Sequence, residues 1–547
     1  MQYAYAVFEL IAGLGAFLLG VKLLSDNMEK LATSRLRNLF HKTSRSKLVG
    51  VGIGTVTTAI IQSSSLTTVM VVGLVNAGVM TLAQATTIIM GANIGTTVTA
   101  QIAALQAFDV ATFAMALTGI GVLVAMFSKK EKVCTVSYAV AGLGLVFVGL
   151  GIMADAMTMV KQSQAVLDLF ASINNPFLLF FLGIAVTAVV QSSSAVTSIL
   201  ISMASAGIII GGGGNSVLFV ILGTNIGTCV TALLSSIGAN VYAKRAAVIH
   251  LLFNVIGSII FFTILICWKD MMSMTLEQWF PGYPSTQIAM FHTFFNVICT
   301  ILFLPFTNLF VKLSSLIVRE RKKDKKPEGE EVTKLDKRLL ATPVIAVENA
   351  TEEALDTLKT ATKCLDSAVS AFLEQDNTKT EEINKINDDI NESLQNISSY
   401  LVQISAYDAT LDLEKRITAL HACIGDINRI AELADNVTKY TRRAVKDNLH
   451  FSPKVKEEIQ DMMSLLNSMS EKSGDALIKK DVSLFKEIDE LENTVDSKRK
   501  SLIKDHIYRL GNGECRPESS GVFINLVCNL ERVGDHLNYI AHSVENV

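Results

Sequence analysis

Two long stretches of this chain carry no charged side chain. Neither residues 48–108 nor residues 176–243 contain an Asp, Glu, Lys or Arg. A soluble domain must show water a polar surface, so charge-free stretches of this length are typical of membrane proteins. A hydrocarbon layer about 30 Å thick needs roughly 20 apolar residues per helix, and each stretch is long enough for more than one crossing. The sequence therefore predicts a polytopic membrane domain over residues 1–318.

Charge divides the chain into two parts. Residues 1–329 hold 21 Lys and Arg against 12 Asp and Glu, whereas residues 330–547 hold 27 against 39. The net charge of −3 thus combines a basic, apolar part with an acidic, polar part. Between them, residues 319–335 carry Lys, Arg, Glu and Pro and almost no apolar side chain, which predicts a solvated, charged linker.

The membrane part repeats itself at a nearly fixed spacing. Ala-Gly-Leu-Gly at 12–15 recurs at 141–144, and Gln-Ser-Ser-Ser at 62–65 recurs at 191–194, both 129 residues later. Asn-Ile-Gly-Thr at 93–96 recurs at 225–228, now 132 residues later. Matches in one order at one spacing indicate an internal repeat rather than coincidence.

The basic residues predict how the two copies are oriented. They cluster at 22–47, 129–132, 244–245 and 319–326, and the positive-inside rule places these clusters in the cytoplasm. Corresponding helices of the two copies then run in opposite directions. Inverted repeats are typical of secondary transporters, whose sites lie at the repeat interface. We expect repeat one at about 5–128, repeat two at about 134–268 and an extra helix at 288–316.

Each Gln-Ser-Ser-Ser motif places four hydrogen-bonding side chains in an apolar segment. Unpaired polar groups are costly in hydrocarbon, so these groups must pair with protein or face a cavity. Hydroxyl and amide groups can donate to an oxyanion and offer neutral oxygens to Na⁺. A single motif would suit polar packing between helices, but two copies at equivalent positions favour a binding site. The segments are longer than one span needs, so we expect one re-entrant or broken helix plus one full span in each copy.

Neutral polar residues also follow each serine motif. Cation coordination is the functional interpretation, and the neighbouring glycines would permit an unwound backbone there; close helix packing through glycine is the alternative. No Lys or Arg lies in either motif segment, so bound Na⁺ would supply the charge that a divalent anion needs, whereas a neutral solute would need none. The candidates for binding the transported solute are Gln62, Ser63, Ser64, Ser65, Gln191, Ser192, Ser193 and Ser194. The candidates for binding a cation are Thr58, Asn93, Thr96, Thr97, Thr187, Asn225 and Thr228.

A shorter similarity links two later segments. His-x-x-Phe-Asn at 250–254 recurs at 292–296, which suggests related helices at 246–268 and 288–316. Two interpretations of this repeated motif stay open: its residues pack the two helices, or they have a structural role beside the site.

From residue 336 onward apolar side chains recur every three or four positions, which predicts helices. We expect two three-helix units there, at about 340–447 and 453–547.

The paired Gln-Ser-Ser-Ser motifs within an inverted repeat resemble the type II sodium–phosphate cotransporter family over roughly residues 1–315. The resemblance implies co-transport of Na⁺ and inorganic phosphate by an elevator-like or rocking alternation around a central site. It assigns phosphate binding to the two motifs and sodium binding to the Thr and Asn candidates above.

The C-terminal part resembles the PhoU family of two three-helix bundles. Glu-Arg-x-x-Asp at 531–535 matches that family and implies a metal site that includes Glu531 and Asp535. The first copy departs from the pattern, because Asn428 replaces an acid and Glu432 replaces Asp. A transporter fused to a PhoU-like tail is similar to bacterial members of the family. This implies a multi-pass protein of the bacterial inner membrane with a cytoplasmic C-terminal domain.

The sequence thus predicts an all-α fold: inverted membrane repeats with broken or re-entrant helices, followed by two three-helix bundles. The expected function is sodium-coupled phosphate transport. A phosphate-binding sensor and a carrier of another oxyanion or a neutral solute are the alternatives. No catalytic motif is present, so no enzyme is expected. The expected partners are phosphate, Na⁺ as coupling ion and the lipid bilayer, with no nucleic acid. A homodimer and a cytoplasmic regulatory partner of the tail stay open.

Overall fold

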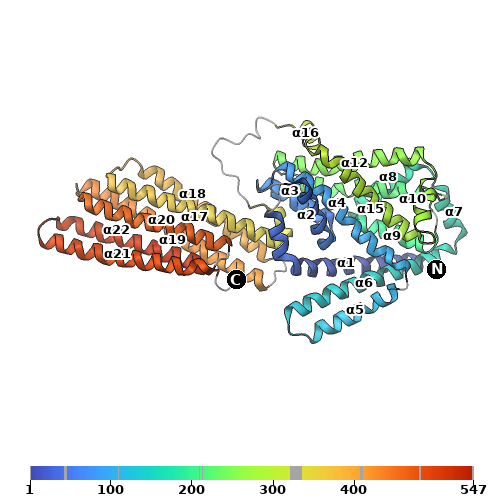
Figure 1. Ribbon diagram of the computed structural model, residues 1–547, viewed down its shortest axis with the longest axis horizontal. Coiled ribbons are helices and arrows are strands. Elements are labelled where there is room, and N and C mark those ends of the chain that lie inside the picture. Colours follow the sequence, from blue (N-terminus) through green and yellow to red (C-terminus); the bar gives the residue numbers. More distant parts are fainter. Residues whose placement is uncertain are drawn as a thin grey trace. The chain divides into compact units, whose positions relative to one another are not determined.

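The computed structural model describes residues 2–41, 46–108, 110–208, 210–211, 213–320, 335–406, 411–479 and 482–544. The chain divides into two compact units, Met1–Val332 and Thr333–Val547. Over the described residues both units are built from helices, with no strand (Figure 1). The predicted all-α fold is confirmed, with the unit boundary inside the expected linker. Apart from residues 319, 320 and 335, that linker lies outside the described residues.

The first unit begins with two matching series of helices. Each series has a long helix, a pair of shorter helices separated at the Gln-Ser-Ser-Ser motif, and further apolar helices. The first series is α1 (Gln2–His41), α2 (Lys47–Ile61), α3 (Ser64–Asn76), α4 (Leu82–Ala104) and α5 (Val110–Phe127). The second is α6 (Glu131–Lys161), α7 (Gln164–Ser172), α8 (Pro176–Val190), α9 (Ser193–Ser205), α10 (Ser216–Gly227), α11 (Cys229–Ser235) and α12 (Val241–Cys267). The short helices α13 (Met271–Met274) and α14 (Leu276–Trp279) and then α15 (Pro284–Phe303) and α16 (Thr307–Ile317) follow.

Helices α1 and α6 lie side by side, and their glycines show how the repeats are related (Figure 1). A Cβ on Gly13 would lie 2.9 Å from the carbonyl oxygen of Gly149, and one on Gly20 would lie 2.9 Å from that of Gly142. Gly142 and Gly149 are the repeat equivalents of Gly13 and Gly20, so the contact is reciprocal, as across a two-fold axis. The two helices are therefore antiparallel, as the basic clusters predict.

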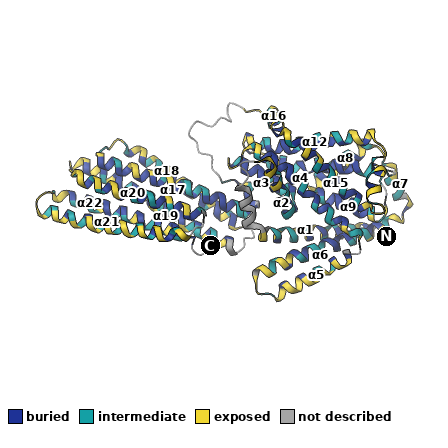
Figure 2. Ribbon diagram, viewed as in Figure 1, coloured by how far each residue is buried: buried dark blue, intermediate teal, exposed yellow. Residues whose placement is uncertain are grey.

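Six helical stretches among the described residues are long and apolar enough to cross a membrane, and the α7–α8 pair, bent by 110°, would make a seventh. Helix α7 was not among the helices expected from the sequence. The surface of this unit suits lipid: Phe113 and Phe127 of α5 are 77% and 83% exposed, and α5 shows wide exposed faces in Figure 2. These features make the chain a multi-pass membrane protein.

Close glycine contacts hold α2 against α4 and α8 against α10. A Cβ on Gly91 would lie 2.0 Å from the carbonyl oxygen of Val51, and one on Gly223 would lie 2.1 Å from that of Phe180. Helix α4 continues unbroken through its Asn-Ile-Gly-Thr motif, and Thr228, between α10 and α11, keeps helical angles (φ −62°, ψ −26°). The expectation of an unwound backbone at these motifs is wrong. The glycines serve close backbone approach, which was the alternative.

The second unit consists of two three-helix bundles, as predicted. Helix α17 packs on both α18 and α19, α22 packs on both α20 and α21, and the bundles meet where α19 contacts α22 and α17 contacts α20. The helices are α17 (Pro343–Glu374), α18 (Thr380–Ser405), α19 (Leu411–Lys446), α20 (Pro453–Lys479), α21 (Phe485–Gly511) and α22 (Pro517–His542).

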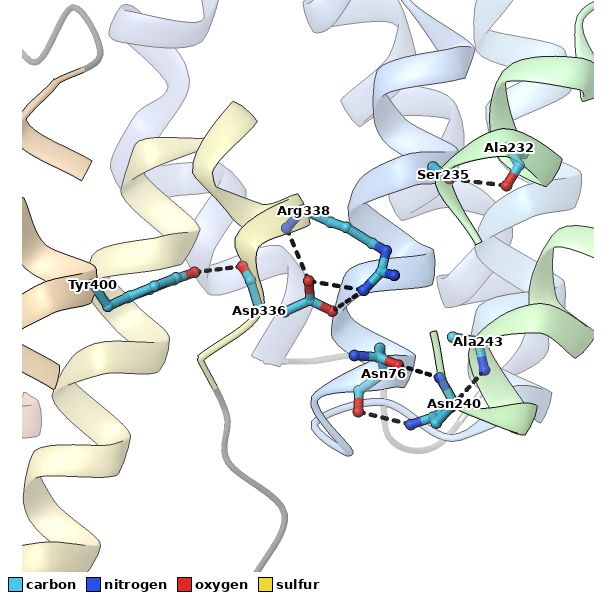
Figure 3. Close-up of polar contacts among 8 residues, drawn as sticks. All are labelled: Asn76, Ala232, Ser235, Asn240, Ala243, Asp336, Arg338 and Tyr400. Carbon is cyan, nitrogen blue, oxygen red and sulfur yellow. Dashed lines mark hydrogen bonds and ion pairs between the residues drawn. The ribbon is translucent and has the colours of Figure 1, made fainter. Parts of the chain in front are cut away.

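The start of this unit is fixed to α18. The hydroxyl of Tyr400 donates to the carbonyl oxygen of Asp336 at 2.7 Å, and the Asp336 carboxylate accepts from Arg338 at 3.1 Å (Figure 3). These contacts hold the short helical turn Lys337–Ala341 at the end of the first bundle.

Candidate functional site

The Gln-Ser-Ser-Ser motifs break the helices in the same way in both repeats. Gln62 (φ 54°, ψ 21°) ends α2 and Gln191 (φ 56°, ψ 22°) ends α8, both in the left-handed conformation. Their backbone N–H groups donate at 2.7 Å to the carbonyls of Thr58 and Thr187, respectively. A left-handed non-glycine residue costs roughly 1–2 kcal/mol, and such strain concentrates at functional sites. The predicted helix breaks are confirmed at both motifs.

The second residue of each motif starts the next helix. Ser63 and Ser192 are extended (φ −144° and −143°), and their hydroxyl oxygens accept from the N–H groups of Leu66 and Ala195 at 3.2 Å. They are therefore the N-caps of α3 and α9. Ser64 and Ser193 follow in the first turns and are buried, while Ser65 and Ser194 are half-buried. N–H groups of a first turn lack helical partners and carry partial positive charge, which favours an anion.

Within repeat one, the helix break at Gln62 and the span α4 contact each other. The hydroxyl of Thr99 on α4 donates to the side-chain oxygen of Gln62 at 2.8 Å. A Cβ on Gly95 would lie 2.6 Å from the Cβ of Thr58, so the Asn-Ile-Gly-Thr motif passes close to α2. The hydroxyl of Thr58 in turn donates to that of Thr67 at 3.0 Å. The break and the full span of this repeat therefore share one polar cluster.

Repeat two has the same close approach but a more open break. A Cβ on Gly227 would lie 2.6 Å from the Cβ of Thr187, which reproduces the Gly95–Thr58 contact. Gln191 is exposed, however, whereas Gln62 is only 7% exposed. The two equivalent motifs therefore differ in accessibility in this structure.

The helices that begin at the serines also join the two repeats. Helix α3 of repeat one packs on α11 and α12 of repeat two, and α9 of repeat two packs on α4 of repeat one. At the far end of α3, the side-chain oxygen of Asn76 accepts from the backbone N–H of Asn240 at 2.7 Å, and the side-chain amide of Asn240 donates to the Asn76 carbonyl at 2.8 Å (Figure 3). Asn240 is also the N-cap of α12. The predicted phosphate-binding residues thus start helices that cross the repeat interface.

Histidines hold the two asparagines predicted to bind sodium. The side-chain oxygen of Asn93 lies 3.3 Å from Nε2 of His250, and that of Asn225 lies 3.2 Å from Nε2 of His292. All four side chains are buried. The repeated His-x-x-Phe-Asn motif signalled related helices, but the sequence did not identify the asparagines as its partners.

Three of the five threonines predicted to bind sodium donate to their own helices, whereas Thr58 donates to Thr67 and the buried hydroxyl of Thr187 has no hydrogen-bond partner within the described residues. Thr96, Thr97 and Thr228 donate to backbone carbonyls three or four residues earlier, at 3.1, 2.7 and 2.9 Å. A hydroxyl that donates keeps its oxygen lone pairs available to a cation. These residues form two groups, one on α4 and one at the end of α10.

Further polar side chains in α3 and α9 were not singled out from the sequence. The hydroxyls of Thr68 and Thr197, which are equivalent in the two repeats, and that of Ser198 are buried, and no hydrogen-bond partner is found for them within the described residues. A water molecule or a ligand could supply the missing partner of such buried hydroxyls. The repeat spacing of 129 residues relates Thr68 to Thr197 and would have identified that pair.

The second unit places Glu531 and Asp535 in an acidic cluster with Glu492. Burial raises the pKa of all three carboxyl groups above the ordinary range, and mutual repulsion adds to the shift of Glu492 and Glu531. Nε of Arg499 lies 3.2 Å from the Glu531 carboxylate, which gives that acid a positive partner. Over the described part of the chain, no group of three or more His, Cys, Asp or Glu side chains has a metal-binding arrangement. The metal site at Glu531 and Asp535 therefore stays a prediction.

In the first bundle, the corresponding residues contact one another. The side-chain amide of Asn428 donates to Glu432 at 2.9 Å, and Arg429 pairs with the same carboxylate at 2.5 Å. The carboxylate of Glu432 therefore has a positive partner, Arg429, on the same helix.

Comparison with known proteins assigns both units to families. The family model described as Na+/Pi-cotransporter matches residues 16–155 and 152–277, and the PhoU domain model matches residues 355–441 and 459–544. The uncharacterized protein YqeW of Bacillus subtilis (strain 168) is 32% identical over 305 residues, which cover 55% of this chain and 95% of YqeW.

Two named transport proteins are also similar. The putative inorganic phosphate export protein YjbB of Escherichia coli (strain K12) is 27% identical over 354 residues, 64% of this chain. The match covers 62% of YjbB, less than two thirds of its length. The human sodium-dependent phosphate transport protein 2B is 36% identical over 106 residues, 19% of this chain and 15% of that protein. This chain is therefore a multi-pass membrane protein that belongs to the Na⁺/Pi-cotransporter family and carries two PhoU domains after its membrane unit.

Proposed function

We propose that the membrane unit is a sodium-coupled secondary transporter of inorganic phosphate. The observation that carries the proposal is the matched pair of helix breaks, in which a left-handed glutamine precedes a serine N-cap in both repeats. Two helix N-termini that belong to inverted repeats can present first-turn N–H groups to one anion from opposite sides. The names of the relatives, a putative phosphate exporter and a sodium-dependent phosphate transport protein, agree with phosphate as the substrate.

In this proposal the motif side chains bind phosphate. Serine hydroxyls both donate and accept, so they can meet the protonated as well as the unprotonated oxygens of HPO₄²⁻. Sulfate has no such proton, so buried acceptors would be left unpaired, which typically costs about 1–3 kcal/mol per group. The proposed phosphate-binding residues are Gln62 to Ser65 and Gln191 to Ser194.

The absence of basic side chains supports sodium coupling. No Lys or Arg occurs between Lys47 and Lys129 or between Lys161 and Lys244, so the proposed site has no positive residue of its own. Na⁺ would supply the missing charge and would bind neutral oxygens of hydroxyl, amide and carbonyl groups. The proposed ligands are Thr58, Asn93, Thr96, Thr97, Thr187, Asn225 and Thr228.

The unequal burial of the two glutamines supports alternating access. Gln62 is covered in this structure while Gln191 is exposed. Inverted repeats that exchange these two environments would open the site first on one side of the membrane and then on the other.

We propose that the protein lies in a bacterial inner membrane, with the PhoU-like unit in the cytoplasm as a regulator. The direction of net transport would follow the gradients of Na⁺ and phosphate.

The experiment is uptake of ³²P-phosphate into proteoliposomes of the full chain, driven by an inward Na⁺ gradient or by an equal K⁺ gradient. We expect uptake with Na⁺, none with K⁺, and competition by unlabelled phosphate but not by sulfate. Equal uptake in both cations would contradict sodium coupling. Phosphate binding without flux in either cation would favour the sensor alternative, and deletion of residues 336–547 would separate that result from inhibition by the tail.

A further inference from the structure

Each histidine of the repeated His-x-x-Phe-Asn motif contacts the asparagine of one Asn-Ile-Gly-Thr motif. His250 and His292 are each 1% exposed, and their Nε2 atoms lie 3.3 and 3.2 Å from the side-chain oxygens of Asn93 and Asn225. Two contacts of the same atom types at almost the same distance occur at repeat-equivalent asparagines. A chance packing arrangement would not be expected to occur twice in this form.

The hydrogen bonds around each asparagine fix which atom donates. The side-chain amide nitrogen of Asn93 donates to the carbonyl of Ile89 at 3.2 Å, and that of Asn225 donates to the carbonyl of Ile221 at 3.0 Å. The atoms that face the histidines are therefore oxygens, which can only accept. Nε2 of each imidazole must carry the proton and donate. The amide plane is thus held at both ends, by its own helix and by a histidine.

An amide oxygen has two lone pairs, and the histidine uses one of them. The second stays available, and Na⁺ binds neutral oxygens of this kind. The neighbouring hydroxyls of Thr96 and Thr228 donate to carbonyls of their own helices, so their oxygens also keep free lone pairs. Fixing the amide determines where its second lone pair lies relative to these hydroxyl oxygens.

Each histidine belongs to a helix outside the repeat that carries its asparagine. His250 lies on α12 of repeat two but holds Asn93 on α4 of repeat one, and His292 lies on α15, after both repeats, but holds Asn225 on α10. Relative movement of these helices would therefore change the orientation of the asparagine oxygen. A cation bound at these asparagines would therefore be linked to the packing of α4 on α12 and of α10 on α15.

We propose that His250 and His292 are positioning residues for the coupling cation. Each donates from Nε2 to the amide oxygen of one asparagine and holds that oxygen in the orientation that binds Na⁺. The inference rests on the proposed function, because it requires that Na⁺ binds at Asn93 and Asn225.

The test compares histidine variants in the full chain, reconstituted in proteoliposomes, by the Na⁺ concentration that gives half-maximal phosphate uptake. His250→Leu removes the donor, whereas the side-chain nitrogen of His250→Gln can take the place of Nε2. We expect the half-saturating Na⁺ concentration to rise about tenfold in His250→Leu, the usual size of one lost buried hydrogen bond, and to stay near the parent value in His250→Gln. The KM for phosphate at saturating Na⁺ should be unchanged in both. His292→Leu and His292→Gln should behave in the same way.

Phe253→Leu is the matched control, because Phe253 is fully buried on the same face of α12, one turn from His250, and makes no hydrogen bond with its side chain. Its Na⁺ dependence should match that of the parent chain. If His250→Leu does not reconstitute, His250→Asn replaces it, because the shorter amide cannot reach Asn93 and should raise the half-saturating Na⁺ concentration in the same way.

The outcomes separate this inference from the proposed function. A Na⁺-dependent parent whose Leu and Asn variants keep its Na⁺ dependence would overturn the inference and leave the function standing. Equal damage in the Gln and Leu variants would also overturn it, because packing rather than the donated proton would then explain the loss. A parent chain that transports phosphate without Na⁺ would overturn both.

Discussion

The hydroxyl of Thr99 donates to the side-chain oxygen of Gln62 at 2.8 Å, and both residues are buried. This hydrogen bond joins the helix break of repeat one to the continuous span α4, 37 residues further along the chain. The side-chain nitrogen of Gln62 also donates, to the carbonyl of Ala59, so its amide is held at both ends. A glutamine fixed in this way can keep the left-handed backbone that separates α2 from α3.

Replacing Thr99 should therefore disturb phosphate binding. Thr99→Val keeps the shape of the side chain but leaves the Gln62 oxygen unpaired, which typically costs about 1–3 kcal/mol. We expect a rise of about tenfold in the KM for phosphate, which corresponds to about 1.4 kcal/mol and lies within the range of such losses. Thr99→Ser keeps the hydroxyl and should transport like the parent chain. Equal KM values for the Val variant and the parent would show that this hydrogen bond does not support the site.

Glycine contacts between α2 and α4 should be essential for folding. A Cβ on Gly91 would lie 2.0 Å from the carbonyl oxygen of Val51, so Gly91→Ala must push the two backbones apart. Overpacking typically costs about 1–3 kcal/mol, and a backbone obstacle makes relief harder. We expect a clear fall in the thermal unfolding midpoint of the detergent-solubilised chain. Gly52→Ala is the control, because nothing lies within 4 Å of its Cβ position, and this variant should unfold like the parent.

Burial and the charges of neighbouring carboxylates should make Glu492 less favourable for the stability of the PhoU-like unit at neutral pH than in mild acid. Burial, followed by the charges of Asp535, Asp496, Asp489 and Glu531, raises the pKa of Glu492 above the ordinary range. A group whose pKa is raised by folding stabilises the fold below its unfolded-state value, and that contribution is lost as the pH rises through the folded-state value. Glu492→Gln should therefore raise the unfolding midpoint of a fragment covering residues 335–547 at pH 7.

The same comparison near pH 4, close to the ordinary pKa of glutamate of about 4.3, should give nearly equal midpoints for the variant and the parent. A Gln variant less stable than the parent at pH 7 would mean that Glu492 makes a favourable contact there. Glu487→Gln is a suitable comparison, because Glu487 pairs with Lys472 at 2.5 Å outside the acidic cluster.

The N-cap serines should contribute to the helix breaks in both repeats alike. Ser63→Ala and Ser192→Ala each remove an oxygen that accepts a backbone N–H at 3.2 Å, which typically costs about 1 kcal/mol. We expect a small decrease in the unfolding midpoint and a loss of transport, because the start of α3 or α9 would no longer be fixed. Ser63→Asp and Ser192→Asp restore a cap but add a negative charge beside the anion site. They should recover stability without recovering transport.

The helix breaks and the inverted repeat could be predicted from the sequence. Polar side chains in an apolar segment that is too long for one span leave few alternatives, and the repeat spacing relates Gln62 to Gln191. The glycines were harder to interpret, because glycine permits both an unwound backbone and a close contact. The carbonyl oxygen of Val51 lies so close to Gly91 that only a glycine fits there, which identifies the close contact as the role of this glycine. That neighbour is known only from the fold.

Two features of the site could not be predicted. His250 and Asn93 are 157 residues apart, and no local pattern pairs them. The two Gln-Ser-Ser-Ser motifs have the same sequence but different surroundings in this structure, so Gln62 is buried while Gln191 is exposed. A symmetric sequence cannot indicate which copy is covered.

The most direct test of the central claim is ³²P-phosphate uptake, driven by a Na⁺ gradient, by Ser64→Ala and Ser193→Ala. These two serines begin α3 and α9 and do not cap them, so the variants remove a proposed ligand while leaving the helix breaks in place. Ser315→Ala is the control, because the hydroxyl of Ser315 is exposed near the end of α16, where it donates to the Lys312 carbonyl. If both motifs form one phosphate site, each single variant will lose most of its uptake and the control will keep it. Full uptake by either single variant would contradict a site shared by the two repeats.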